Sequence, residues 1–206
     1  PIAAAGAVDQ SNATTRVVSF ELDADDTDAL LKACHRAYRT ETPDLLLAAV
    51  LRGFQRWSDV STLLFSMEGH GREALSNDID HSETVGWLTS LYPLALRAPT
   101  TSSVGDLVMH VKEQMRAVPA KGMGYGLLRH ISGVDALAPS TPRNDILFNY
   151  LGQFDQSEAE GIAFATEFAG HTVSPRRRRE HAAEITALIS TGRLSFAMGF
   201  NGLEQE

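Results

Sequence analysis

The sequence has a single cysteine, Cys34, among its 206 residues, which excludes an internal disulfide and indicates a reducing compartment. Basic residues are outnumbered by acidic ones, and the formal net charge of −8 argues against the cationic surface that non-specific nucleic-acid binding needs. No apolar run approaches the length of a membrane span, and no cationic start leads into an apolar stretch typical of a secretion signal. These absences predict a cytoplasmic protein that binds neither nucleic acid nor membrane.

Several signatures of catalysis and cofactor binding are also missing. There is no Gly-x-Ser-x-Gly elbow, no P-loop and no dinucleotide fingerprint. His35, His81 and His110 are scattered, are expected to be exposed and lack metal-ligand spacing. The one basic run, residues 176–179, is interpreted as a solvated loop. We therefore expect no metal site and no directly bound cofactor.

The apolar periodicity predicts strands and helices that alternate along the chain. A strand pattern over residues 16–22 leads into acidic residues 23–28, which suit a helix N-terminus. Thr42 and Pro43, a cap and a first-turn proline, open an apolar helix. The other predicted elements are a buried strand at 61–67, an apolar strand in 84–96 closed by Pro93, a helix from Val104 ended by Pro119, strands at 146–154 and 162–168, and a hairpin of 184–190 and 194–200 around Thr191 and Gly192.

This alternation, without an internal repeat, predicts a layered α/β or α+β lobe in which helices back a mixed β-sheet. Residues 1–13 are small and polar, and are interpreted as a linker or a remnant of expression. Residues 14–206 form the predicted lobe. Cys34 lies on the apolar stripe of a helix and is interpreted as a small buried side chain.

Residues 68–73, Glu-Gly-His-Gly-Arg-Glu, are the most informative hexapeptide. Glu68 follows an apolar strand directly, and sites of α/β folds commonly form where strands end. A carboxylate held there in a poorly solvated channel would have a raised pKa, which suits a general base. The alternative is a surface turn with an ion pair between Glu68 and Arg72. His70 lacks the partners typical of a zinc or iron site.

Three further segments carry polar or glycine-rich patterns, and each has an ordinary interpretation as well. Residues 84–93 indicate a core strand, and residues 121–126 indicate a flexible loop or the approach to a helix. Residues 148–154 indicate a strand with one polar face. In this last segment Asn149 and Tyr150 could donate hydrogen bonds to a developing oxyanion.

In this order, the four segments resemble the motif series of epimerisation domains of nonribosomal peptide synthetases, from about Arg16 onward. Relatives of these domains are the condensation domains and the chloramphenicol acetyltransferase superfamily. The resemblance implies two similar lobes in a V, each a sheet backed by helices, with the active channel between them. This chain is similar to the C-terminal lobe. The first-lobe motif, His-His-x-x-x-Asp-Gly, is absent, and Glu83 stands where the family usually has arginine.

The resemblance also implies a reaction. An aminoacyl or peptidyl thioester, carried on the phosphopantetheine of a peptidyl carrier protein domain, has its α-carbon inverted from L to D in secondary metabolite (antibiotic) biosynthesis. The implied catalytic residues are Glu68 and Tyr150, and the implied channel or supporting residues are His70, Arg72, Asn149, Trp87, Tyr92, Gly124 and Tyr125. The N-terminal lobe is an implied partner, so the isolated lobe is expected to be inactive.

Two alternatives to epimerisation remain. The first is the lobe of a condensation domain that forms peptide bonds, although in that family the stretch matching residues 85–96 usually differs and the hexapeptide is absent. The second is a non-catalytic lobe that docks a carrier domain.

Overall fold

The computed structural model describes residues 11–73, 80, 83–99, 103–132, 146–154 and 170–201. After a 3-10 turn at Asn12–Thr14, the elements are β1 (Arg16–Glu21), α1 (Ala24–Ala29), a π-helical turn (Leu30–Cys34), α2 (His35–Tyr38), α3 (Thr42–Ser58), β2 (Thr62–Gly69), β3 (Ser90–Arg97), α4 (Val104–Arg116), a 3-10 turn (Pro119–Gly122), α5 (Gly124–His130), β4 (Ile146–Phe154), β5 (Ala183–Ser190) and β6 (Arg193–Phe200).

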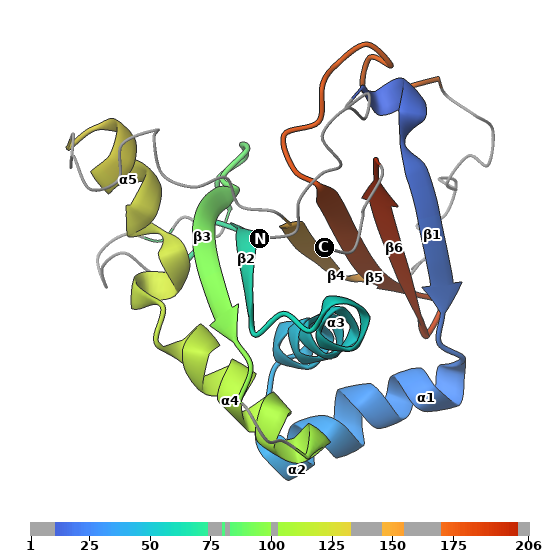
Figure 1. Ribbon diagram of the computed structural model, residues 1–206. Coiled ribbons are helices and arrows are strands. Elements are labelled where there is room, and N and C mark those ends of the chain that lie inside the picture. Colours follow the sequence, from blue (N-terminus) through green and yellow to red (C-terminus); the bar gives the residue numbers. More distant parts are fainter. Residues whose placement is uncertain are drawn as a thin grey trace, which may run out of the picture.

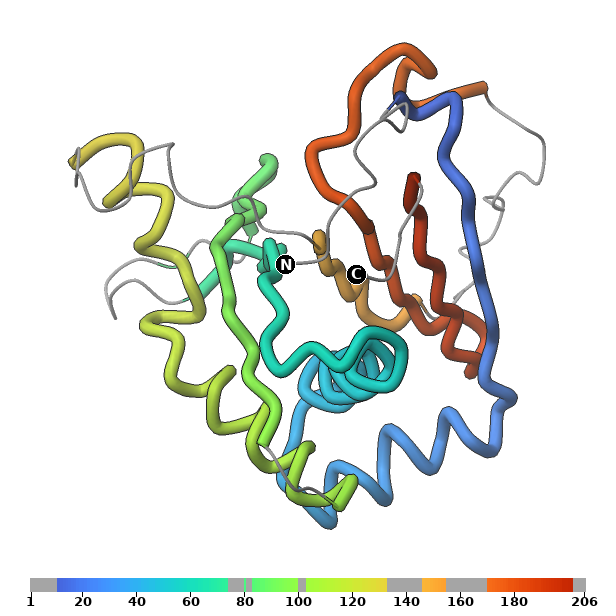
Figure 2. Tube along the Cα trace, in the orientation of Figure 1, coloured from blue at the N-terminus to red at the C-terminus, as the bar shows by residue number. Residues whose placement is uncertain are grey.

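The strands form one six-stranded sheet in the order β1-β6-β5-β4-β2-β3. The pairs β2–β4 and β4–β5 are parallel, and the other three pairs are antiparallel. The predicted mixed sheet is therefore confirmed. Figure 2 shows how the trace brings β2 and β4 side by side although about eighty residues separate them.

Helix α3 lies across one face of this sheet, with α1 and α2 below it and α4 beside β3 (Figure 1). We call this the inner face. Its residues on β2, β4 and β5 are largely buried, and Phe65 and Phe148 meet edge to face with ring centroids 6.5 Å apart. Leu47 and Leu51 of α3 are fully buried against it. The opposite, outer face carries the alternate residues, including Glu68, Asn149 and Glu184.

The helix starts follow local capping. The Asp23 side chain accepts a hydrogen bond from the Asp26 backbone N–H at 2.8 Å and caps α1, as the acidic stretch predicts. In α3 the predicted cap, Thr42, is wrong by one position. Glu41 is the N-cap, because its backbone N–H donates to the Asp44 carboxylate at 2.8 Å, and Thr42 is the first helical residue. Cys34, expected to be buried, is only half-buried in the π-helical turn.

The apolar strand predicted within residues 84–96 begins later than expected and is not closed by Pro93. β3 starts at Ser90, and Pro93 lies in its middle, opposite Ser66. A proline is tolerated there because β3 is an edge strand of the described sheet and needs a partner on one side only. Upstream, Val85 is 99% exposed and does not belong to the core.

The other predicted elements are largely confirmed. Strands β5 and β6 form the predicted antiparallel hairpin, in which Thr191 and Gly192 both have positive φ, as a tight turn between twisted strands requires. Ser11 pairs with Arg178, so the last residues of the predicted linker contact the body of the lobe. The predicted strand at 162–168, together with Asp78, His81 and Ser82, lies outside the described residues.

Of the two interpretations of residues 121–126, the approach to a helix is confirmed, because a 3-10 turn leads here into helix α5. Gly122 in this turn has φ +82° and lies against the ring of Tyr92; a Cβ at Gly122 would come within 2.1 Å of that ring. Since Tyr92 is itself only 7% exposed, neither side can move away easily.

We expect Gly122→Ala to lower the free energy of unfolding by about 2–5 kcal/mol, from left-handed backbone strain together with overpacking. The control is Gly126→Ala in α5, where an added Cβ meets nothing within 4 Å and alanine favours the helix. Denaturant unfolding of both variants tests this. Equal stabilities would contradict the close contact between Gly122 and Tyr92.

Candidate functional site

A cleft of about 630 Å³ opens where β2 and β4 end and α3 begins. Its wall is mixed in character: apolar residues alternate with ionisable and amide side chains. The lining residues are Glu41, Thr42, Pro43, Met67, Glu68, Gly69, His70, Gly71, Glu73, Thr89, Ser90, Tyr92, Met115, Lys121, Phe148, Asn149, Tyr150, Leu151 and Gly152. The cleft therefore contains both predicted catalytic residues.

Glu68 and Asn149 meet because of the parallel register of β2 and β4. Met67 pairs with Phe148, so the next residue on each strand lies beside the other on the outer face. The Asn149 Nδ2 atom donates a hydrogen bond to Glu68 Oε2. The Glu68 carboxylate is therefore oriented by a side chain of the neighbouring strand β4, and not by a residue of the loop that follows Glu68.

The surroundings of Glu68 favour its protonated form. Burial raises the pKa of the Glu68 carboxyl above its usual value, and the negative charge of Glu184 acts in the same direction. The hydrogen bond from Asn149 opposes this rise in pKa, because it stabilises the carboxylate. The net direction is upward, as the sequence pattern predicts for a general base.

The rest of the hexapeptide forms a compact loop. His70 Nδ1 accepts from the Arg72 backbone N–H at 3.0 Å, and His70 Nε2 lies 3.1 Å from Glu73 Oε1. The Arg72 guanidinium donates to the carbonyl oxygen of Thr84 at 2.8 Å, which ties the loop to the segment before β3. Gly71 has φ +66° and passes so close to the Leu88 carbonyl that a Cβ would lie 1.5 Å from its oxygen. This position therefore requires glycine.

Tyr150 reaches the cleft beside the first turn of α3. Burial raises the pKa of its hydroxyl, and a hydrogen bond with Thr42 acts in the opposite direction. Thr42 Oγ1 also lies 3.2 Å from His35 Nε2, so His35 is half-buried here rather than exposed as predicted. Tyr92, on the far wall, has its pKa raised by burial and by the nearby Glu73 carboxylate.

Besides Arg72, whose guanidinium reaches the Thr84 carbonyl, three of the predicted supporting residues lie outside the residues that line the cleft. Trp87 is 90% exposed, because residues 84–89 precede the strand and are not packed into the sheet. Gly124 begins α5, and the Tyr125 hydroxyl accepts from Arg129 Nη1 at 2.9 Å. A channel role for these three stays a prediction. Among the described residues, no group of three or more His, Cys, Asp or Glu is arranged for a metal.

Sequence reasoning missed a polar cluster on the outer face. Arg179 is predicted to be solvated but is only 6% exposed. Its guanidinium lies on the outer face of the sheet, where it pairs with Glu184 at 3.3 Å. His181 Nε2 lies 3.0 Å from the Ser66 hydroxyl, two residues before Glu68. The strict alternation along β5 was the available signal, since it places Glu184 opposite the buried Ala183 and Ile185.

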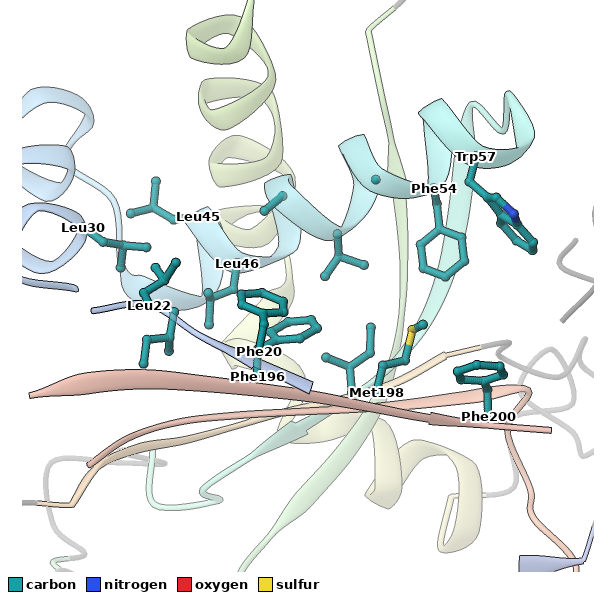
Figure 3. Close-up of a pocket in the computed structure, with 15 residues that line it drawn as sticks. Phe20, Leu22, Leu30, Leu45, Leu46, Phe54, Trp57, Phe196, Met198 and Phe200 are labelled. Carbon is teal, nitrogen blue, oxygen red and sulfur yellow. The ribbon is translucent and has the colours of Figure 1, made fainter. Parts of the chain in front are cut away.

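A second cavity, of about 680 Å³, lies between α3 and the half of the sheet formed by β5, β6 and β1 (Figure 3). Figure 3 shows Phe54, Trp57 and Met198 pointing into it from the helix and the sheet. None of its lining residues is ionisable. It therefore offers no side chain that could act as an acid or base, and of the two cavities only the cleft is lined by ionisable side chains.

The condensation domain family matches residues 5–204, so this chain belongs to the condensation domain family. A linear gramicidin synthase protein of Brevibacillus parabrevis is 37% identical to it over 199 residues, which cover 94% of this chain and 4% of that protein. Surfactin synthase subunit 1 of Bacillus subtilis is 34% identical over 199 residues, which cover 95% of this chain and 6% of that protein. The chain thus spans only a small part of the length of each of these synthases.

Among solved structures, the epimerization domain from the third module of tyrocidine synthetase B superposes with a TM-score of 0.86 and 35% identity, over 96% of this chain and 45% of that one. The condensation domain of the Monacolin K polyketide synthase MokA matches with a TM-score of 0.68 at 17% identity, over 96% of this chain and 44% of that one, which shows a shared fold. The resemblance and the α/β fold predicted from the sequence are thus confirmed. In the described part of the chain, no helix is both long and apolar enough to cross a membrane.

The raised pKa of Glu68 predicts an effect on stability. Between the ordinary glutamate pKa of 4.5 and the raised native value, the folded state binds more protons than the unfolded state, so stability falls as pH rises through this window. Glu68→Gln keeps an oxygen for Asn149 and removes the charge of this half-buried carboxylate. We expect it to be more stable than the wild type at pH 7, with the gain lost below pH 4.5.

Thermal unfolding at several pH values measures this gain. The control is Glu113→Gln on α4, which removes a carboxylate that is 63% exposed and should give no gain at neutral pH. A wild type that is as stable as Glu68→Gln at every pH would rule out a desolvated carboxylate at Glu68.

Proposed function

We propose that this chain is the C-terminal lobe of an epimerisation domain, and that Glu68 takes or returns the α-proton of a carrier-bound aminoacyl or peptidyl thioester. The observation that carries this proposal is the Glu68 carboxylate, oriented by Asn149 in a cleft at the strand ends, with a pKa raised by burial. The likeness to the epimerization domain of tyrocidine synthetase B supports the choice of reaction. Residues 14–206 are the proposed extent of the lobe.

The chemistry requires a base and a stabilised enolate. A thioester acidifies its α-hydrogen because sulfur donates poorly into the carbonyl. In the proposed step the C–H bond breaks, its proton passes to a Glu68 oxygen and its electron pair forms the enolate. Inversion needs the proton returned to the opposite face, so a second acid from the N-terminal lobe must face Glu68 across the channel.

Two side chains are suited to the enolate oxygen. Asn149 uses one N–H for Glu68 and carries a second on the same nitrogen. Tyr150 brings a hydroxyl whose pKa is raised by burial, so it remains a neutral donor at pH 7. Donors held in place before the reaction stabilise developing charge more effectively than water does. The thioester itself is proposed to arrive on the phosphopantetheine arm of a peptidyl carrier domain.

Condensation is the second candidate, favoured by the description of the matching family. The two reactions differ in the fate of the α-hydrogen, because peptide-bond formation leaves it in place. In deuterated solvent, the two-lobed protein with a loaded carrier domain should incorporate deuterium at the α-carbon. Peptide formation without deuterium uptake would favour condensation instead.

We expect Glu68→Gln to abolish α-deuterium incorporation in the two-lobed protein, a loss of about 100-fold or more, because general-base catalysis contributes at least this much. The exposed-site variant Glu113→Gln should retain the wild-type rate. Mass spectrometry of the released amino acid, combined with chiral chromatography, measures both. Full activity in Glu68→Gln would remove this residue from the reaction.

Tyr150→Phe should lower the same rate by about 10-fold or more if the hydroxyl binds the enolate, since oxyanion donors act mainly on the transition state. An unchanged rate would mean that Tyr150 has only a packing role.

This chain expressed alone should show no turnover, because the proposed second acid and one wall of the channel are missing. Measurable inversion by the isolated chain would overturn the proposal that acids on two opposite faces of the substrate are needed.

A further inference from the structure

The outer face of the sheet carries an ion pair between a buried arginine, Arg179, and Glu184, whose side chain is 38% exposed. Arg179 approaches from the segment before β5, and its side chain is 3% exposed. Its Nη2 donates to the Gly199 carbonyl at 2.9 Å and lies 3.3 Å from Glu184 Oε1, while its Nη1 donates to Thr15 Oγ1 at 3.3 Å. The guanidinium is therefore held by three separate parts of the chain.

Gly199 makes room for this guanidinium. A Cβ at Gly199 would lie 3.3 Å from Arg179 Nη1, so a larger side chain would press against the pair. Burying an arginine is costly unless its charge is matched and its hydrogen bonds are made. Here Glu184 matches the charge and both terminal nitrogens donate hydrogen bonds, while the buried Nε has no hydrogen-bond partner among the described residues. The cluster thus fixes the position of the Glu184 carboxylate on the outer face.

The strand register relates Glu184 to Glu68. Glu184 pairs with Leu147 on β4, and Leu147 in turn pairs with Ser66 on β2. Glu68 lies one outward-facing step further along β2, with Asn149 beside it. The carboxylates of Glu68 and Glu184 therefore lie on the same face of the sheet, on strands β2 and β5, with β4 between them. Of the two, Glu184 is the one paired with a buried cation.

Other charged and titratable groups surround Glu68. They come from the start of α3, the hexapeptide loop, β3, the turn after α4, β4 and the segment leading into β5: Glu41, His70, Glu73, Tyr92, Lys121, Tyr150, Arg179, His181 and Glu184. The Glu73 carboxylate pairs with both His70 and Lys121. Among these groups, the negative charge of Glu184 raises the pKa of the Glu68 carboxyl.

We propose that Arg179 and Glu184 are positioning residues for the reaction: Arg179 holds the Glu184 carboxylate in place on the outer face, and Glu184 acts through space to make Glu68 the stronger base. The inference rests on the proposed role of Glu68. A negative charge nearby disfavours ionisation of a carboxyl group, so the Glu184 carboxylate increases the proton affinity of Glu68. The raised pKa of Glu68 agrees with this direction.

The test compares the pH dependence of α-deuterium incorporation in the two-lobed protein. Glu184→Gln removes a like charge, which stabilises the Glu68 carboxylate, so the acidic limb should move to lower pH by about half a unit or more. Arg179→Gln removes a positive charge and leaves Glu184 unpaired, which destabilises the Glu68 carboxylate, so the acidic limb should move to higher pH. A purely structural role would not give shifts of opposite sign. The control, Glu180→Gln, removes a carboxylate that is 73% exposed in the same segment and should leave the limb in place.

Titration of the Glu68 carboxyl carbon by ¹³C NMR, in the same protein without substrate, gives a second readout that needs no turnover. Its midpoint should fall in Glu184→Gln and stay unchanged in Glu180→Gln. An unchanged midpoint in a folded Glu184→Gln protein overturns the inference, even if Arg179→Gln fails to fold. If Glu68→Gln keeps its activity, the proposed function fails, while the NMR midpoints still decide whether the two carboxylates are coupled.

Discussion

The structure depends on the short parallel ladder between β2 and β4. Three residue pairs, from Phe65 with Ile146 to Met67 with Phe148, join a two-stranded unit to a four-stranded one. On the inner side of this ladder, the rings of Phe65 and Phe148 pack together in the core. One residue beyond the last pair, on the outer side, Asn149 donates a hydrogen bond to Glu68. Because strand pairing fixes both faces at once, packing on one side determines the geometry of the carboxylate on the other.

Helices cover one face of the sheet, and polar side chains occupy the other near the strand ends. This division separates two physical tasks. The inner face supplies burial, while the outer face holds charges that would be unfavourable in the core. The cleft lies at the border, where Tyr150 reaches the start of α3 and Glu68 projects from the polar side. The site can thus be partly desolvated without a charge being placed inside the core.

Local patterns in the sequence were sufficient for most elements and for part of the site. The Asp23 cap, the alternation in β5 and the turn at Gly192 are local signals, and the hexapeptide pointed to Glu68. Long-range pairing was not accessible: nothing near Arg179 indicates that its guanidinium crosses β6 to reach Glu184. Likewise, Pro93 suggests the end of a strand until the neighbouring strands show that β3 lies at an edge.

The contact between Tyr92 and Gly122 has an evolutionary consequence. Because the ring occupies the space that any side chain at Gly122 would need, the glycine cannot be replaced while the tyrosine is kept. A lineage that replaces the glycine must first, or at the same time, accept a smaller residue in place of the tyrosine. The constraint runs in one direction, so among aligned sequences of this family a side chain at Gly122 should occur only where Tyr92 has already given way to a smaller residue.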